Sequence, residues 1–314
     1  MIIQKTTGRI AKFSAGLLVL AMITSCAPNK LSIKTAYSRL DNQIYSNINA
    51  YADFTAEQKA WIRESSEQFQ RWHRANELPL YASALTAFSD QIQSGQSVTR
   101  NDVLRWFDEF ESLSNRSFEQ LPLIKSVDVM TTLSDEQVRD IALHMTERNL
   151  GQREKILEQE SMGNNLARID RIGTSLSQLG IELTSEQRLI IDRGLNRYEG
   201  DRTDRIDVLI DWQSQFIALL EKRDQPGFGT AMSHHISTYR QQMRAHYPDR
   251  SKRNTETAAQ TTAELINSLT DAQRQEMIAR LDTVRTVLTD LHHAQLVTVK
   301  LKGFVEVLDP NHGM

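Results

Sequence analysis

The sequence of 314 residues contains one cysteine, Cys26, and six prolines. A single cysteine cannot form an internal disulfide, so a hydrophobic core must hold the fold, and a chain of this length can bury one. No proline lies between Pro122 and Pro226, which favours long helices because proline interrupts a helix interior. Dense basic runs are also missing, and the formal net charge is −3. We therefore expect no nucleic-acid binding, which needs a clustered positive surface.

Long apolar runs are missing as well. The run that begins at Gly16 and ends before Cys26 is shorter than the roughly 20 apolar residues that a membrane-spanning helix needs. Basic residues precede this run, and no acidic residue lies before Cys26. A basic start, a short apolar stretch and small residues before a cleavage point predict a secretory signal peptide over residues 1–25, cut between Ser25 and Cys26. An ordinary signal peptide with a nearby cysteine and an uncleaved anchor helix are the alternatives.

Ile23-Thr24-Ser25-Cys26 resembles the lipobox of bacterial lipoproteins. The resemblance implies that Cys26 is lipidated and becomes the first mature residue, so that its acyl chains anchor the protein in the membrane. Ala27 follows the cysteine where an aspartate would signal retention in the inner membrane. By similarity to enterobacterial lipoproteins, we expect an outer-membrane anchor with the mature domain facing the periplasm, or less often the outside.

The rest of the sequence has helical periodicity. Apolar residues follow the i, i+3, i+4, i+7 pattern in one segment and alternate steps of four and three in another, as in a heptad seam; the first set is Val138, Ile141, Ala142 and Met145, and the second is Met277, Leu281, Val284, Leu288 and Leu291.

We expect an all-α fold: one domain of packed antiparallel helical hairpins over residues 38–295, after a lipid-anchored tether at residues 26–37. Polar residues 247–262 predict a looser link. In the C-terminal tail, residues 296–314, the alternating stretch 296–301 would suit either a short strand or a tail packed on the helices.

One local pattern predicts where helices begin: an apolar residue, Ser or Thr, two further residues and Gln. This is a capping box, in which the hydroxyl accepts from a backbone N–H and the Gln side chain bonds back to the cap residue. A looser copy covers residues 98–102. The pairs that we expect to cap helices are Thr55 and Gln58, Ser134 and Gln137, Thr184 and Gln187, and Thr270 and Gln273.

Two family resemblances follow from these motifs. Residues 72–82 (WHRANELPLYA) and 106–108 (WFD) are similar to the signature of an uncharacterised proteobacterial lipoprotein family, which implies a lipobox and a helical mature part but no activity. Residues 183–188 and 269–275 resemble the Leu-Thr-x-x-Gln motif of the Spy and CpxP periplasmic stress proteins. That second resemblance implies a chaperone or stress-modulating role, although this chain is about twice as long and contains more copies of the motif.

Residue types that carry chemistry form no convincing site in the sequence. We expect His73 to be partly exposed and bonded to a nearby carboxylate, with a buried polar contact or a ligand as the alternative. The adjacent pairs His234-His235 and His292-His293 point about 100° apart on a helix, so they cannot easily share an ion. Neither a nucleophile elbow nor a phosphate loop is present. We assign no catalytic residue, no metal ligand and no cofactor.

The aromatic residues offer a candidate binding surface. Trp61, Trp72, Trp106 and Phe107 are expected to lie in the core, but where exposed they would form a groove for a partner helix or an unfolded chain.

The expected function is a non-catalytic envelope interaction or chaperone-like module, whose partners are the membrane, through acylated Cys26, and an envelope protein or unfolded client. An envelope enzyme acting on wall or lipid material and a purely structural lipoprotein are the alternatives. An enzyme predicts one deep pocket with convergent carboxylates or histidines, whereas a binding module predicts an apolar groove or patch.

Overall fold

The computed structural model describes residues 29–120, 127–161, 165–200 and 203–308, which fold into helices without a strand among them. The all-α expectation is therefore confirmed. Within these residues, none of the helices combines the length and the apolar character needed to cross a bilayer. The helices are α2 (Lys30–Ser38), α3 (Leu40–Asn49), α4 (Ala56–Asn76), α5 (Leu78–Gln93), α6 (Arg100–Glu119), α8 (Val127–Met130), α9 (Asp135–Ser161), α10 (Leu166–Ser177), α11 (Ser185–Asn196), α12 (Asp204–Leu220), α13 (Phe228–Ser237), α14 (Tyr239–Ala245), α15 (Pro248–Asn267) and α16 (Asp271–Leu308).

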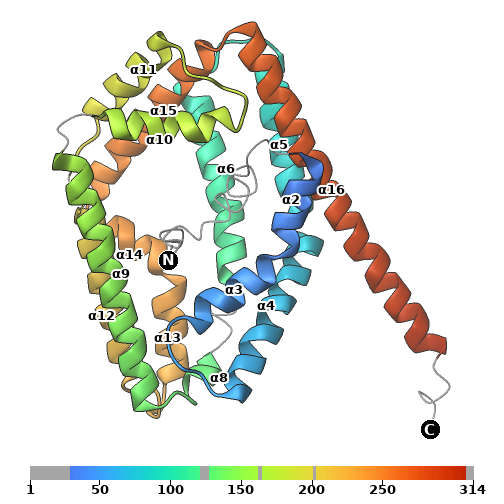
Figure 1. Cartoon of the computed structure of the whole chain (residues 1–314), viewed down its shortest axis with the longest axis vertical. Helices are drawn as coiled ribbons and strands as arrows, with labels where there is room; N and C mark the ends of the chain where they lie inside the picture. The colour runs from blue at the N-terminus through green and yellow to red at the C-terminus, as the bar shows by residue number, and fades with distance from the viewer. Residues whose placement is uncertain (1–28, 121–126, 162–164, 201–202, 309–314) are drawn as a thin grey trace, which may run out of the picture.

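The helices are arranged around a ring (Figure 1). The pair α9 and α12 forms one side of this ring, and α4, α5, α6 and α16 form the other. One end is closed by α10, α11 and α15, and the other by α8 and α13. Neighbours around the ring are in contact: α16 packs on α5, α15 packs on α6 and α11, and α12 packs on α9.

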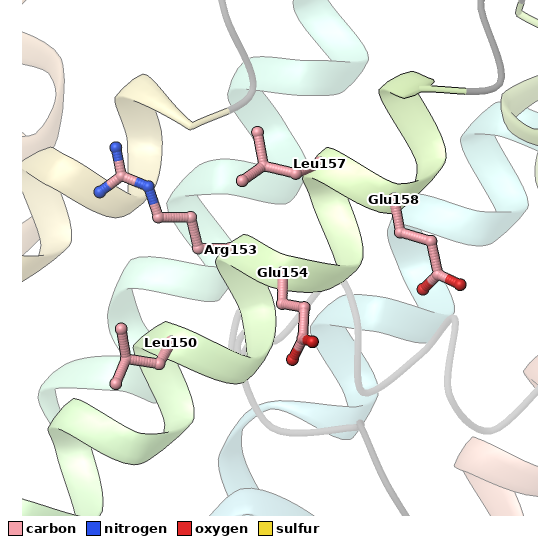
Figure 2. Close-up of a pocket in the computed structure, with 5 residues that line it drawn as sticks. All are labelled: Leu150, Arg153, Glu154, Leu157 and Glu158. Atoms are coloured by element: carbon pink, nitrogen blue, oxygen red, sulfur yellow. The ribbon is translucent and has the colours of Figure 1, made fainter.

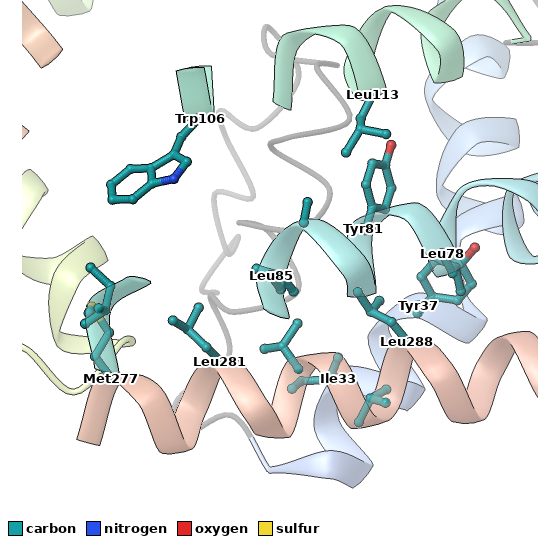
Figure 3. Close-up of a cluster of buried hydrophobic side chains, with 14 of the residues drawn as sticks. Ile33, Tyr37, Leu78, Tyr81, Leu85, Trp106, Leu113, Met277, Leu281 and Leu288 are labelled. Atoms are coloured by element: carbon teal, nitrogen blue, oxygen red, sulfur yellow. The ribbon is translucent and has the colours of Figure 1, made fainter. Parts of the chain in front are cut away.

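Two groups of buried apolar side chains form the core. The first core cluster lies among α2–α6, α15 and α16, and the second lies among α4, α8, α9, α12 and α13. All five residues of the predicted heptad seam on α16 are buried in the first cluster. Figure 3 shows Met277, Leu281 and Leu288 along α16, facing side chains such as Leu85 of α5. The seam thus packs within one chain against α5.

The structure differs from the sequence-based expectations at three segments. Residues 30–38 form α2 rather than a free tether, because Ile33 and Tyr37 are buried in the first core cluster. The polar link expected at residues 247–262 is helical from Pro248 onward. Pro248 is tolerated in the first turn of α15 because its missing N–H costs nothing there. The backbone of residues 296–308 continues α16 instead of forming a strand. Residues 1–28, including Ser25 and Cys26, lie outside the described residues.

The four glutamine capping boxes are present at the starts of α4, α9, α11 and α16. At α4, the Gln58 backbone N–H donates to Thr55 Oγ1 (3.2 Å), and the Thr55 N–H donates to Gln58 Oε1 (2.9 Å). The same two bonds join Ser134 with Gln137, Thr184 with Gln187 and Thr270 with Gln273. Each box satisfies backbone N–H groups that the first turn of a helix leaves without a partner.

The capping glutamines also bind one another in pairs, which the sequence pattern does not reveal. Gln58 Nε2 donates to Gln137 Oε1 (3.2 Å), and Gln137 Nε2 donates back to Gln58 Oε1 (2.8 Å). The remaining N–H of each amide donates to a backbone carbonyl in front of the other helix: Gln58 to Thr132 and Gln137 to Asp53. Both amides thereby use their full donor and acceptor capacity.

A second pair repeats this arrangement between α11 and α16. Gln187 and Gln273 exchange amide hydrogen bonds of 2.9 and 3.1 Å. Gln187 Nε2 also donates to the Ser268 carbonyl, and Gln273 Nε2 donates to the Glu182 carbonyl. We call these two arrangements the paired glutamine caps; they join helix starts that are 79 and 86 residues apart.

Because each capping glutamine serves both its own helix and a remote one, its removal should cost more than an ordinary cap. We predict that Gln187→Ala and Gln273→Ala each lower the free energy of unfolding by about 2 to 4 kcal/mol, from the lost cap and the polar groups left unpaired. The double variant should cost less than the sum, with a coupling of about 1 kcal/mol in urea unfolding.

The matched control is Asp102→Ala, which removes the N3 residue of the capping box of α6, where Thr99 is the cap. Asp102 bonds to Thr99 and Arg105 at the start of α6 and to the Gln91 side chain of α5, and none of these partners is a second capping glutamine. We therefore expect a smaller loss, of about 1 kcal/mol. Additive losses for Gln187 and Gln273 would contradict an energetic role for the pairing.

Candidate functional site

The aromatic residues considered as a binding surface lie in or against the core. Trp106 is buried, and its ring meets Phe88 edge-on with 4.5 Å between centroids. Trp72 and Phe107 pack on the first core cluster, and Trp61 packs on the second. These four residues therefore do not form an exposed groove, and their main contribution is to packing.

The signature segment 72–82 instead builds a buried polar cluster at the junction of α4 and α5. The expectation of a partly exposed His73 bonded to a carboxylate is wrong: His73 is fully buried, and its Nδ1 shares a hydrogen bond of 2.7 Å with the Tyr37 hydroxyl of α2. Its ring lies 5.6 Å from Phe69 and 5.5 Å from Tyr81 between centroids. Burial among these groups lowers the pKa of His73 to about 3, so the imidazole is neutral near pH 7.

Glu77, one turn after His73, connects the cluster to α6. Its side chain is fully buried, and Oε1 accepts from Nε (3.2 Å) and Nη2 (3.1 Å) of Arg116. Tyr81 on α5 exchanges a hydrogen bond of 2.8 Å with Ser117 on α6, and burial raises the pKa of Tyr81 well above its usual value. His292 of α16 donates from Nδ1 to the Arg74 carbonyl (3.0 Å). One turn of α4 is thus connected to α2, α5, α6 and α16.

Several polar atoms of this cluster have no partner. His73 Nε2, Arg74 Nε and Glu77 Oε2 are buried without a hydrogen bond within the described part of the chain. An unpaired buried polar group costs roughly 1 to 3 kcal/mol, so these three atoms lower the free energy of unfolding. Neither His73 nor Glu77 has exposed surface, and a substrate could not reach them unless α4 moved. The cluster therefore positions helices and is not placed to act as a catalytic site.

The buried histidine of α13 contacts α12. His235 stacks on Trp212 at 4.6 Å between centroids, and its Nε2 donates to the Trp212 carbonyl (3.0 Å). Its pKa is lowered, mainly by burial. Among the described residues, His, Cys, Asp and Glu form no group of three or more that could hold a metal ion.

An exposed row of leucines on α9 is the surface feature that sequence reasoning missed. Leu143, Leu150 and Leu157 have 62%, 63% and 52% of their surface exposed. They are seven residues apart, so they lie on one side of the helix, one above the other. We call them the α9 leucine row. Their spacing is visible in the sequence, but Val138, Ile141 and the partly buried Met145 form a stripe with stronger helical periodicity on another face of the same helix.

Another face of α9 is held by α12. Val138 and Ile141 are buried in the second core cluster together with Phe216 of α12, and Asn149 Nδ2 donates to Gln213 Oε1 (2.5 Å). Arg153, which lies beside the leucine row, also reaches α12 through an ion pair with Asp207 (3.0 Å). These contacts account for the position of α9 without the leucine row, whose side chains are not required to anchor the helix.

An open hollow of about 510 Å³ lies along the C-terminal half of α9. Figure 2 shows Leu150, Arg153 and Leu157 projecting to one side of the helix, and Glu154 and Glu158 to the other. All five lining residues belong to α9. The hollow is therefore an open surface along one helix rather than a cleft between elements. Such a surface can take up apolar side chains of another helix or of an extended segment, with the charged residues at its edges.

Comparison with known proteins gives one match. The model of a family of unknown function, DUF6279, matches residues 50–248, a range that includes the signature segment and all of α9. No curated protein matches, and no solved structure matches.

The depressed pKa of His73 makes stability depend on pH. The folded-state pKa is about 3, below the ordinary value of 6.5, so the unfolded chain binds a proton that the folded chain excludes between these values. The stabilisation is complete above pH 6.5 and is lost as the pH falls toward 3. We predict that His73→Asn flattens this part of the profile in urea unfolding, while His234→Asn, which changes an exposed histidine, does not. Parallel profiles for wild type and His73→Asn would contradict the prediction.

Proposed function

The chain belongs to the DUF6279 family, and because that family is described only as one of unknown function, we propose a function from the chain's own residues. In this proposal the chain is a lipid-anchored envelope protein, and its helical domain binds apolar helical or unfolded segments of other proteins through α9. The role is non-catalytic, either as an interaction module or as a chaperone-like one.

The α9 leucine row carries this proposal. Three leucines exposed by more than half, on one side of a helix, are costly to leave in water, at roughly 25 cal/mol per Å² of apolar surface. Their spacing of seven residues matches the repeat of an amphipathic partner helix. An unfolded segment with apolar side chains would cover the same surface with less geometric demand.

The Leu-Thr-x-x-Gln motifs support the stress-protein resemblance only as structural elements. In this chain their Thr and Gln side chains are engaged in the capping boxes and the paired glutamine caps. The leucines before them, Leu183 and Leu269, belong to or pack on the first core cluster. A chaperone-like activity would therefore act through α9 rather than through the motifs themselves.

An envelope enzyme is the less favoured candidate. Glu154 and Glu158 are two carboxylates beside an open hollow, but both are on one helix and exposed. General acid–base catalysis needs groups that converge on a substrate, with pKa values shifted by a partly enclosed site.

A purely structural role is also less favoured, because it does not explain why the three leucines of the α9 leucine row are exposed.

The anchor is proposed from the lipobox resemblance at residues 23–26. We predict that Cys26→Ala yields an unprocessed precursor that incorporates no labelled palmitate and is absent from the outer-membrane fraction, because the acceptor of the acyl chains is gone. Fractionation and palmitate labelling of both forms measure this. Labelling and outer-membrane recovery of the variant equal to wild type would refute the anchor.

The binding surface is tested by changing all three residues of the leucine row to serine. We predict unchanged unfolding, because these side chains are exposed, together with loss of ANS binding and of suppression of aggregation of an unfolding client. Leu189→Ser is the matched control: Leu189 is 61% exposed on α11 but lies outside the row, so its removal should leave both readouts intact. Undiminished suppression by the triple variant would contradict the proposed surface.

A further inference from the structure

The first helix begins almost directly at the proposed anchor. Asn29 accepts the Ser32 N–H (2.8 Å) and thereby caps α2, so the chain is part of the fold from residue 29 onward. Three residue steps separate Cys26 from Asn29, and a fully extended chain covers at most about 3.6 Å per step, or about 11 Å in all. If Cys26 is acylated as proposed above, on which this inference rests, the start of α2 is held at the lipid headgroups.

The outer face of α2 has the chemistry of a membrane contact. Leu31 is 73% exposed, the highest value for a large apolar residue among those whose side chains the structure describes. Lys30 and Lys34 are exposed beside it, and Arg39 is exposed just after the helix. The helix contains no acidic residue. An apolar side chain among cations matches the surface of a bilayer, where the hydrocarbon boundary lies beneath anionic phosphates.

The inner face of α2 fixes this orientation. Ile33 and Tyr37 are buried in the first core cluster. The Tyr37 hydroxyl bonds to His73, and the Tyr37 carbonyl accepts from Gln70 Nε2 (2.8 Å). Because both the side chain and the backbone of Tyr37 are bound to α4, the helix cannot turn Leu31 inward without breaking the buried cluster.

We propose that the exposed face of α2, consisting of Leu31, Lys30 and Lys34, is a membrane-docking surface that sits on an anionic phospholipid bilayer. Leu31 enters the interfacial region, and the two lysines contact lipid phosphates. The acyl chains on Cys26 supply the attachment, and α2 sets the orientation of the domain on the bilayer. In Figure 1, α2 and α9 lie on different sides of the ring, so this orientation leaves α9 away from the docking surface.

The experiment uses the fact that the chain has one cysteine, whose thiol is blocked in the acylated protein. Leu31→Cys and, as the matched control, Leu189→Cys are expressed as full chains, acylated in the cell, labelled with a nitroxide and reconstituted into phosphatidylethanolamine–phosphatidylglycerol vesicles. Both positions are exposed in the fold. Flotation with the vesicles reports the anchor, and collision with lipid-soluble oxygen or with a water-soluble nickel chelate reports the depth of the label.

We expect the label at position 31 to become accessible to oxygen and to lose accessibility to the nickel chelate on reconstitution, while the label at position 189 remains aqueous. This difference should shrink in vesicles of phosphatidylcholine alone, which lack net negative charge. A label at 31 that stays aqueous on vesicles with which the protein floats would overturn the docking surface but leave the anchor standing. Failure of both variants to float would overturn the anchor and the docking surface with it. Equal depth on both vesicle types would overturn the role of the lysines.

Discussion

Reciprocal hydrogen bonds between side-chain amides hold the starts of distant helices together in this protein. Gln58 and Gln137 join α4 to α9, and Gln187 and Gln273 join α11 to α16. Each amide accepts from its own helix start and donates to the backbone before the other, so neither helix can shift along its axis without leaving buried polar groups unpaired. In a largely buried setting such a loss costs more than the bonds themselves contribute.

The same kind of contact recurs elsewhere in the ring. Asn267 at the end of α15 binds both the N–H and the carbonyl of Val98, just before α6. Asn254, within α15, binds the N–H and carbonyl of Glu199. Apolar packing between helices in a ring is tolerant of small shifts, because an area-dependent attraction is non-directional. Directional amide bonds at the helix ends supply the alignment that the apolar clusters alone would leave loose.

The buried cluster around His73 and Glu77 links the proposed membrane-facing end to the rest of the domain. Tyr37 on α2, Arg116 on α6 and the His292 ring on α16 all meet one turn of α4. The proposed functional surfaces are supported from behind in a similar way: α2 by this cluster, and α9 by α12 through Asn149. In both cases polar contacts fix the inner face of a helix, and exposed leucines remain on the outer face.

Much of the local structure follows from the sequence alone. Helical periodicity and scarce proline determined the all-α class, the Ser/Thr-x-x-Gln pattern determined the starts of α4, α9, α11 and α16, and the heptad seam determined the buried face of α16. These are effects of residues within one or two turns of each other, which a local pattern contains. The short separation between Cys26 and the first helix is also a property of the sequence. The helical state of residues 30–37 is not evident from it, because α2 is stabilised by burial against α4 and α16 and its own pattern suggests only a tether.

Tertiary structure decided what those local elements are used for. The pairing of the capping glutamines depends on contacts between residues tens of positions apart. The same contacts decide which apolar side chains are covered: Trp61, Trp72, Trp106 and Phe107 pack on the core, whereas Leu143, Leu150 and Leu157 remain in solvent. An apolar side chain on a helix has the same periodicity whether a neighbour covers it or not. Only the placement of α12 against one side of α9 leaves the other side exposed, and that placement comes from packing around the whole ring.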